Sequence, residues 1–98
     1  MPVPARLTIV GGLSAQSFDF TGEAVLGRGG DCQVCLDEAA ISRRHARVHW
    51  TYPGYVVEDL GSINGTFVNG EMVERRLLHG GEVIEVGLVQ LRFNYVQD

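Results

Sequence analysis

Three arginines, two histidines and a serine gather within ten residues, Ile41 to Trp50, which read ISRRHARVHW. The rest of the chain is acidic: eight basic residues, all arginine, face twelve acidic ones, for a net charge of -4 and a pI near 5.2. Positive charge beside a hydroxyl could serve a nucleic acid, a catalytic site or a pocket for a small, strongly charged anion. The acidic balance argues against a general nucleic-acid or anionic-membrane binder, because such proteins need a basic surface.

Catalysis is the second possibility, since Ser42, His45 and Asp59 could form a hydrolase triad. Ser42, however, has no G-x-S-x-G elbow around it, and its neighbours are arginines rather than an oxyanion turn. His45 lies where a loop enters an expected strand, and we predict that it ties loop backbone together by hydrogen bonds. We therefore predict that the chain is not an enzyme.

Two further motifs could carry chemistry. Cys32 and Cys35 form a C-x-x-C pair, but zinc needs two more ligands, and in an extended segment the two residues lie about 10 Å apart, too far for a disulfide. The stretch LGRGGDC is rich in glycine but is followed by no expected helix and lacks the P-loop lysine. We expect two ordinary cysteines, no metal and no cofactor. Arg28 remains: held between glycines, it could present its planar fork to a phosphate or be a solvated surface arginine.

The elements that would position these residues are short strands. Apolar and polar residues alternate with a period of two, as a half-buried strand requires, and this pattern recurs in residues 6–10, 17–20, 45–50, 55–59, 82–86 and 91–96. Glycine-containing turns separate the runs, and Asn69-Gly70 suits a tight hairpin. Many short strands at close spacing indicate an antiparallel sandwich or barrel.

Two segments are ambiguous. Residues 37–47 contain good helix formers, yet their apolar positions form no 3.6-residue stripe, so we predict a loop followed by a strand. Residues 71–78, EMVERRLL, are predicted to be a short strand and a loop. Ninety-eight residues suit one domain. We find no apolar run long enough to cross a membrane and no signal peptide, and therefore expect a cytoplasmic setting.

Together these pieces resemble the forkhead-associated (FHA) domain, over about Leu7 to Tyr95. The resemblance rests on LGR at 26–28, ISRRHARV at 41–48 and DLGSINGTFVNG at 59–70, and LLHGGEVIEVG at 77–87 resembles the late hairpin of the family. It implies an all-β fold, a two-sheet antiparallel β-sandwich of the FHA / SMAD-like type. We expect a single domain over residues 1–98, with its core at about 5–96, that belongs to a larger signalling protein.

The resemblance also implies a function, the recognition of phosphothreonine-containing proteins or peptides in Ser/Thr-kinase signalling. In the family, loops at one end of the sandwich hold the ligand, with an arginine and a serine on the phosphate and an asparagine on the peptide backbone. The phosphopeptide-binding residues that it implies are Arg28, Ser42, Arg43, Ile63 and Asn64. The loop-structuring residues that it implies are Gly27, His45 and Gly65.

Ile63 departs from the family pattern, in which threonine or serine usually precedes the asparagine. A hydroxyl contact toward the phosphate is therefore missing, although the Ile63 backbone N–H can remain, and one lost charge-assisted hydrogen bond weakens binding by roughly 1.5–3 kcal/mol. This keeps open a different function, a phosphate-independent scaffold or self-association module. Nucleic-acid binding through a basic helix is disfavoured by the net charge.

Overall fold

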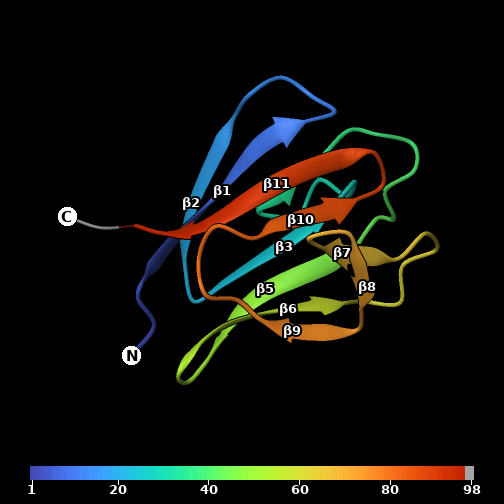
Figure 1. The fold of residues 1–98 in the computed structure, drawn as a ribbon. Coiled ribbons are helices and arrows are strands. Elements are labelled where there is room, and N and C mark those ends of the chain that lie inside the picture. Colours follow the sequence, from blue (N-terminus) through green and yellow to red (C-terminus); the bar gives the residue numbers. More distant parts are fainter. Residues whose placement is uncertain (97–98) are drawn as a thin grey trace.

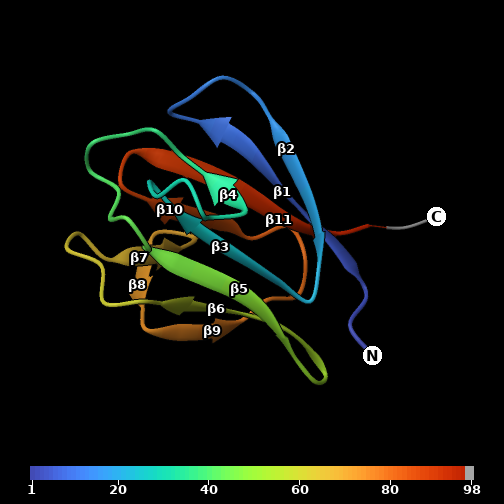
Figure 2. The same ribbon diagram turned by 180° about the vertical axis from the view of Figure 1, so that it is seen from behind.

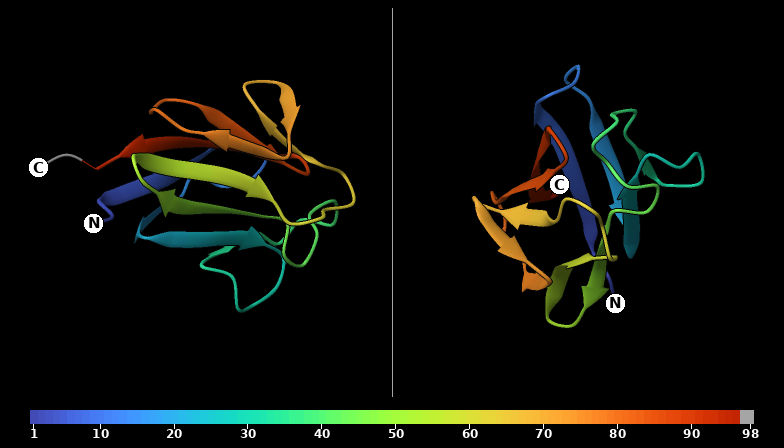
Figure 3. Two further views of the ribbon diagram at one scale, coloured as in Figure 1. Left: turned by 90° about the horizontal axis from the view of Figure 1, so that it is seen from below. Right: turned by 90° about the vertical axis from the view of Figure 1, so that its right-hand side faces the viewer.

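Two β-sheets pack face to face in the computed structural model, which describes residues 1–96. The two layers are seen edge-on in the left panel of Figure 3. In spatial order the six-stranded sheet contains β2 (Ser17–Thr21), β1 (Pro4–Gly11), β11 (Val89–Tyr95), β10 (Val83–Val86), β7 (Thr66–Val68) and β8 (Glu71–Val73). The five-stranded sheet contains β4 (Val34–Cys35), β3 (Glu23–Gly27), β5 (Ala46–Thr51), β6 (Gly54–Asp59) and β9 (Arg75–Leu77). The predicted all-β sandwich is confirmed.

Strand pairing is antiparallel with one exception. β4 runs parallel to β3, with Leu26 opposite Val34 and Gly27 opposite Cys35. The purely antiparallel prediction is wrong at this edge, because the chain doubles back after Gly27 before it pairs again. The side chain of Gln33 supplies a further contact here, since its Oε1 accepts the Val25 N–H at 2.8 Å.

Residues 71–78 are the second correction. They form two strands, β8 and β9, which lie in different sheets and are separated by Glu74 alone. Strands of three residues are too short to show an alternating pattern, so the predicted loop is in part a strand. The late hairpin also lies further along than the segment 77–87: it consists of β10 and β11, whereas β9 and β10 belong to different sheets.

The interior follows the alternation of the sequence. In β5, which pairs with β3 and β6, Ala46 and Val48 are fully buried in the core between the two sheets, while Arg47 and His49 lie on the outer face of the sheet. Tyr55 is the largest fully buried side chain, and its ring contacts several aromatic neighbours, Phe20, Trp50, Phe93 and Tyr95. Removal of these apolar side chains from water supplies the main stabilisation of the sandwich.

The loops of interest lie together at one end. Residues 36–45 contain no helix and lead into β5, which confirms the predicted loop and strand. In Figure 1 this loop (green) and the loop after β6 (yellow) project on the right, whereas the chain enters and leaves the sandwich on the left. Figure 2 shows the same arrangement from behind. The two sheets thus hold these loops at the end away from Pro4 and Val96.

Candidate functional site

The loop after β3 and the loop before β5 are joined through their backbones. The Arg28 N–H donates to the Ser42 carbonyl at 3.1 Å, and the Gly29 N–H donates to the Arg43 carbonyl at 3.0 Å. The close approach requires glycine at position 27, because a Cβ there would lie 2.2 Å from the Arg43 carbonyl oxygen. The segment containing Arg28 is therefore fixed against the segment containing Ser42.

His45 connects these loops to the third one. Its side chain is fully buried. Nδ1 accepts the Ser42 backbone N–H at 3.1 Å, and Nε2 lies 2.7 Å from the Gly65 carbonyl, to which it donates. With one nitrogen accepting and the other donating, the ring is the neutral tautomer with its hydrogen on Nε2. The imidazole thus binds Ser42 through its main chain rather than through its hydroxyl.

Asp59 organises the loop between β6 and β7. Its Oδ2 accepts the N–H groups of Gly61 and Ser62 at 3.0 and 3.1 Å, and its Oδ1 accepts the hydroxyls of Ser62 and Thr66, the latter at 2.7 Å. Burial alone would raise the pKa of Asp59, but these donors together hold it below its usual value. The carboxylate therefore serves the loop and not the imidazole, so Ser42, His45 and Asp59 do not assemble as a triad.

The resulting surface presents three polar groups. Ser42 Oγ accepts the Ile63 N–H at 3.1 Å, which leaves its own O–H to donate outward. The Nε of Arg28 donates to the Ile41 carbonyl at 2.9 Å, so its exposed terminal nitrogens can face a ligand. Asn64 Nδ2 donates to the Ala40 carbonyl at 2.8 Å, so its Oδ1 can accept a hydrogen bond from a peptide N–H. The Ile63 N–H, which the sequence left available to a ligand, is directed at Ser42 instead.

Arg43 and Arg44 add positive charge beside this surface. Both side chains are exposed, and Arg44 lies 3.8 Å from Asp31. No pocket is formed by residues 1–96, so any ligand of this site lies across an open surface. Hydroxyl and guanidinium donors on one side and an amide oxygen on the other suit an anionic group carried by an extended peptide.

The two cysteines contact the backbone of these loops. Both thiols are free. The buried Cys32 thiol donates to the Arg43 carbonyl at 3.3 Å, and burial raises its pKa. The exposed Cys35 thiol lies 3.8 Å from the Arg28 carbonyl. The two thiols contact different carbonyls and thus support the loops separately. Within the described part of the chain, no group of three or more potential metal ligands is found.

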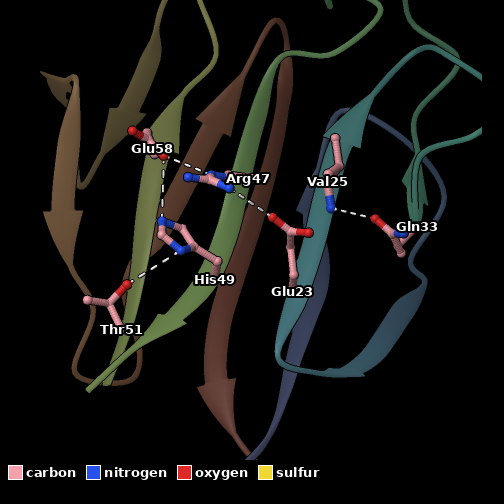
Figure 4. A network of polar contacts seen from close by, with 7 residues as sticks. All are labelled: Glu23, Val25, Gln33, Arg47, His49, Thr51 and Glu58. Carbon is pink, nitrogen blue, oxygen red and sulfur yellow. Dashed lines mark hydrogen bonds and ion pairs between the residues drawn. The ribbon is translucent and has the colours of Figure 1, made fainter. Parts of the chain in front are cut away.

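A second polar cluster covers the outer face of β3, β5 and β6, shown in Figure 4. Arg47 donates to Glu58 at 2.8 Å and to Glu23 at 3.1 Å. His49 Nε2 lies 3.5 Å from Glu58, which by itself would raise the pKa of His49. Burial and the neighbouring Arg47 outweigh this pairing and lower the pKa, so the ring is neutral at pH 7. This cluster links β3, β5 and β6 across the outer face of their sheet.

The geometry defines a β-sandwich domain whose loops at one end carry Arg28, Ser42 and Asn64. Its family follows from the sequence comparisons. The family model of the FHA domain matches residues 24–87. The glycogen accumulation regulator GarA of Mycobacterium tuberculosis is 35% identical over 94 residues, 94% of this chain. The ABC transporter ATP-binding/permease protein Rv1747 of the same organism is 42% identical over 72 residues, 74% of this chain. The chain belongs to the FHA domain family.

The three-dimensional comparison agrees. A solved FHA domain, from a structural and functional study of phosphothreonine-dependent FHA interactions, superposes with a TM-score of 0.88 at 30% identity, covering 98% of this chain and all of that one. The chain spans only 58% of the length of GarA and 8% of Rv1747. No helix among residues 1–96 is long and apolar enough to cross a membrane.

Proposed function

We propose that this chain binds phosphothreonine-containing peptides through the surface formed by Arg28, Ser42 and Asn64. The observation that carries the proposal is the way His45 joins the loops, since it accepts the Ser42 N–H and donates to the Gly65 carbonyl. Arg28 and Asn64 support it, because their side chains donate to the carbonyls of Ile41 and Ala40, in the same loop as Ser42. The superposed FHA domain with phosphothreonine-dependent interactions supports the same function.

The proposed roles follow from the hydrogen-bond donors and acceptors that each side chain leaves free. Arg28 and the Ser42 hydroxyl donate to the phosphate, a group of about -1.5 to -2 charges with three acceptor oxygens. Asn64 accepts from the peptide backbone next to the phosphothreonine. Arg43 adds positive charge through its exposed side chain, and Ile63 borders the phosphate through its exposed side chain. On an acidic chain this is a local site for one dianion rather than a general basic surface.

The domain acts in this proposal as a recognition module in a Ser/Thr-kinase pathway and not as an enzyme. The Ser42 hydroxyl accepts the Ile63 N–H, and the imidazole of His45 accepts the main-chain N–H of Ser42, an arrangement that supports binding rather than activation of the hydroxyl as a nucleophile. Phosphothreonine marks are written by kinases that use intracellular ATP, which supports a cytoplasmic setting. A longer protein that includes this domain would couple recognition to an effector, as the longer relatives suggest.

Arg28→Ala tests the proposal by fluorescence-anisotropy titration with phosphothreonine, phosphoserine and unphosphorylated versions of a degenerate peptide pool. The wild-type chain should bind only the phosphothreonine pool. The variant should lose roughly 10- to 100-fold in affinity, because charge-assisted hydrogen bonds to the phosphate disappear. Arg44→Ala is the charge-matched control, since it removes one nearby positive charge that already lies 3.8 Å from Asp31.

The result that would overturn the proposal is wild-type binding that is equal, or equally absent, across the three pools. Phosphate-independent binding, or a stable dimer in analytical ultracentrifugation that Ser42→Ala leaves intact, would instead favour the scaffold or self-association function.

A further inference from the structure

An exposed apolar surface adjoins the phosphate-binding end. Its members are Val10, Leu13 and Leu88, which are 49%, 39% and 70% exposed, and we call it the Leu88 surface. The first two belong to the end of β1 and the loop after it, and Leu88 to the turn between β10 and β11 (Figure 1). Exposed apolar side chains are usually scattered singly, and a group of them marks an interaction surface.

The two segments of the Leu88 surface are in direct contact. A Cβ on Gly12 would lie 2.1 Å from the Leu88 carbonyl oxygen and 2.9 Å from the Cα of Val89. Gly12 has a positive φ of 101°, so its conformation and its close approach both require glycine. Gly12, which directly precedes Leu13, is thereby fixed against the turn that carries Leu88.

Glu38 joins this surface to the phosphate-binding loop. One carboxylate oxygen accepts the Leu88 N–H at 2.8 Å and the other accepts the Ala40 N–H at 2.8 Å. These two backbone donors lower the pKa of Glu38, so it remains ionised and bound at neutral pH. The Ala40 carbonyl in turn accepts the Asn64 amide. A continuous chain of hydrogen bonds therefore runs from Leu88 to the residue proposed to hold the peptide backbone.

Backbone packing brings the two regions equally close. A Cβ on Gly87 would lie 3.2 Å from the carbonyl carbon of Ala40 and 2.7 Å from a side-chain carbon of Ile41. The Ile41 carbonyl is the group that fixes Arg28. The turn that presents Leu88 thus packs on the same loop that sets the phosphate donors, and the two regions form one face.

We propose that the Leu88 surface is a second contact area for the phosphothreonine-bearing partner, taken up by apolar side chains of that same partner. The proposal rests on the phosphothreonine-binding function above. Phosphate and backbone contacts alone recognise any phosphothreonine segment. Apolar burial at a fixed distance from the phosphate adds affinity only for partners that carry apolar side chains at the matching place. Continuity with the phosphate site selects this occupant.

The test begins with a phosphothreonine peptide library that has several randomised positions on each side of the phosphothreonine. Sequences selected on the wild-type chain should carry apolar residues at a fixed distance from the phosphothreonine. The double variant Leu13→Ser, Leu88→Ser should bind a selected peptide about fivefold to tenfold more weakly, since part of two leucine side chains is no longer buried. A phosphothreonine peptide flanked only by glycine and serine should bind both proteins equally.

Val3→Ser is the matched control, because Val3 is 41% exposed and precedes β1 at the other end of the sandwich. In NMR titrations the amides of Gly12, Leu13 and Leu88 should shift with the selected peptide and stay unmoved with the glycine–serine peptide. Selection without apolar residues, or a double variant that binds the selected peptide as tightly as wild type, overturns the inference and leaves the proposed function intact. If the glycine–serine peptide binds wild type equally with and without phosphate, the proposed function fails, and this inference fails with it.

Discussion

The main-chain N–H of Ile63 donates to the hydroxyl oxygen of Ser42 over 3.1 Å. This bond occupies an acceptor position of the hydroxyl and directs its O–H proton away from Ile63, toward the open surface. It also uses the one polar group that Ile63 possesses on this side, while the Ile63 side chain is 90% exposed. Ser42 is therefore pre-oriented as a donor, and the hydrogen bond that Ile63 makes at the site comes from its backbone.

Ile63→Thr should strengthen phosphothreonine binding. The substitution keeps the branched Cβ and the backbone bond to Ser42 but adds a hydroxyl beside the phosphate. One additional charge-assisted hydrogen bond predicts up to about a tenfold gain in affinity, measured by anisotropy with a phosphothreonine peptide. Ile63→Val is the control, since it shortens the side chain without adding a donor. Equal effects of threonine and valine would show that the hydroxyl makes no phosphate contact.

Gly27→Ala should damage both stability and binding. The new Cβ would lie 2.2 Å from the Arg43 carbonyl oxygen and 3.0 Å from the Cys32 sulfur, so the two loops must separate. We expect a loss of about 1–3 kcal/mol in the free energy of unfolding, measured by urea denaturation, with weaker phosphopeptide binding. Gly30→Ala is the matched control in the same loop, because nothing lies within 4 Å of the Cβ it adds. Similar losses in both variants would contradict the steric explanation.

The sandwich and the candidate loop residues could be predicted from the sequence, because both leave local signals in it. Period-two alternation marks the longer strands, and the positions of Arg28, Ser42 and Asn64 follow from short motifs. It could not show that β8 and β9 belong to different sheets, since three-residue strands have no readable period. The parallel pairing of β4 with β3 could not be predicted for the same reason, since β4 has only two residues.

Asp59 and Glu38 show the same difference between contacts that leave a local sequence signal and contacts that do not. Sequence analysis gave Asp59 a role only as a possible triad member, although an Asp two residues before a glycine is a local sign of a side chain that caps a turn, as Asp59 does for Gly61 and Ser62. Glu38 left no such sign, because its second partner, the Leu88 N–H, lies 50 positions away in the chain. Contacts that the fold creates between distant loops are beyond local pattern analysis.

Asp59→Asn should destabilise the domain in a pH-dependent way. An amide nitrogen cannot accept the N–H groups that one carboxylate oxygen now accepts, so we expect a loss of about 1–3 kcal/mol in the free energy of unfolding at neutral pH. Because the pKa of Asp59 is lower in the folded state, its stabilisation is present above the unfolded value of about 3.9 and is lost as pH falls through the folded value. Urea midpoints of both proteins should converge on acidification below about pH 4. A difference between the two urea midpoints that widens below about pH 4 would contradict this explanation.

His49→Gln should reduce the loss of stability between neutral and mildly acidic pH. Burial and Arg47 lower the pKa of His49 in the folded state, so the unfolded chain binds the proton first. The folded state is therefore favoured above the unfolded value of about 6.5 and loses this advantage as pH falls from there toward the folded value. Urea midpoints across this range should fall less steeply in the variant, and NMR titration of the imidazole gives the folded pKa directly. A titration midpoint above about 6.5 would mean that the pairing with Glu58, at 3.5 Å, outweighs burial and Arg47.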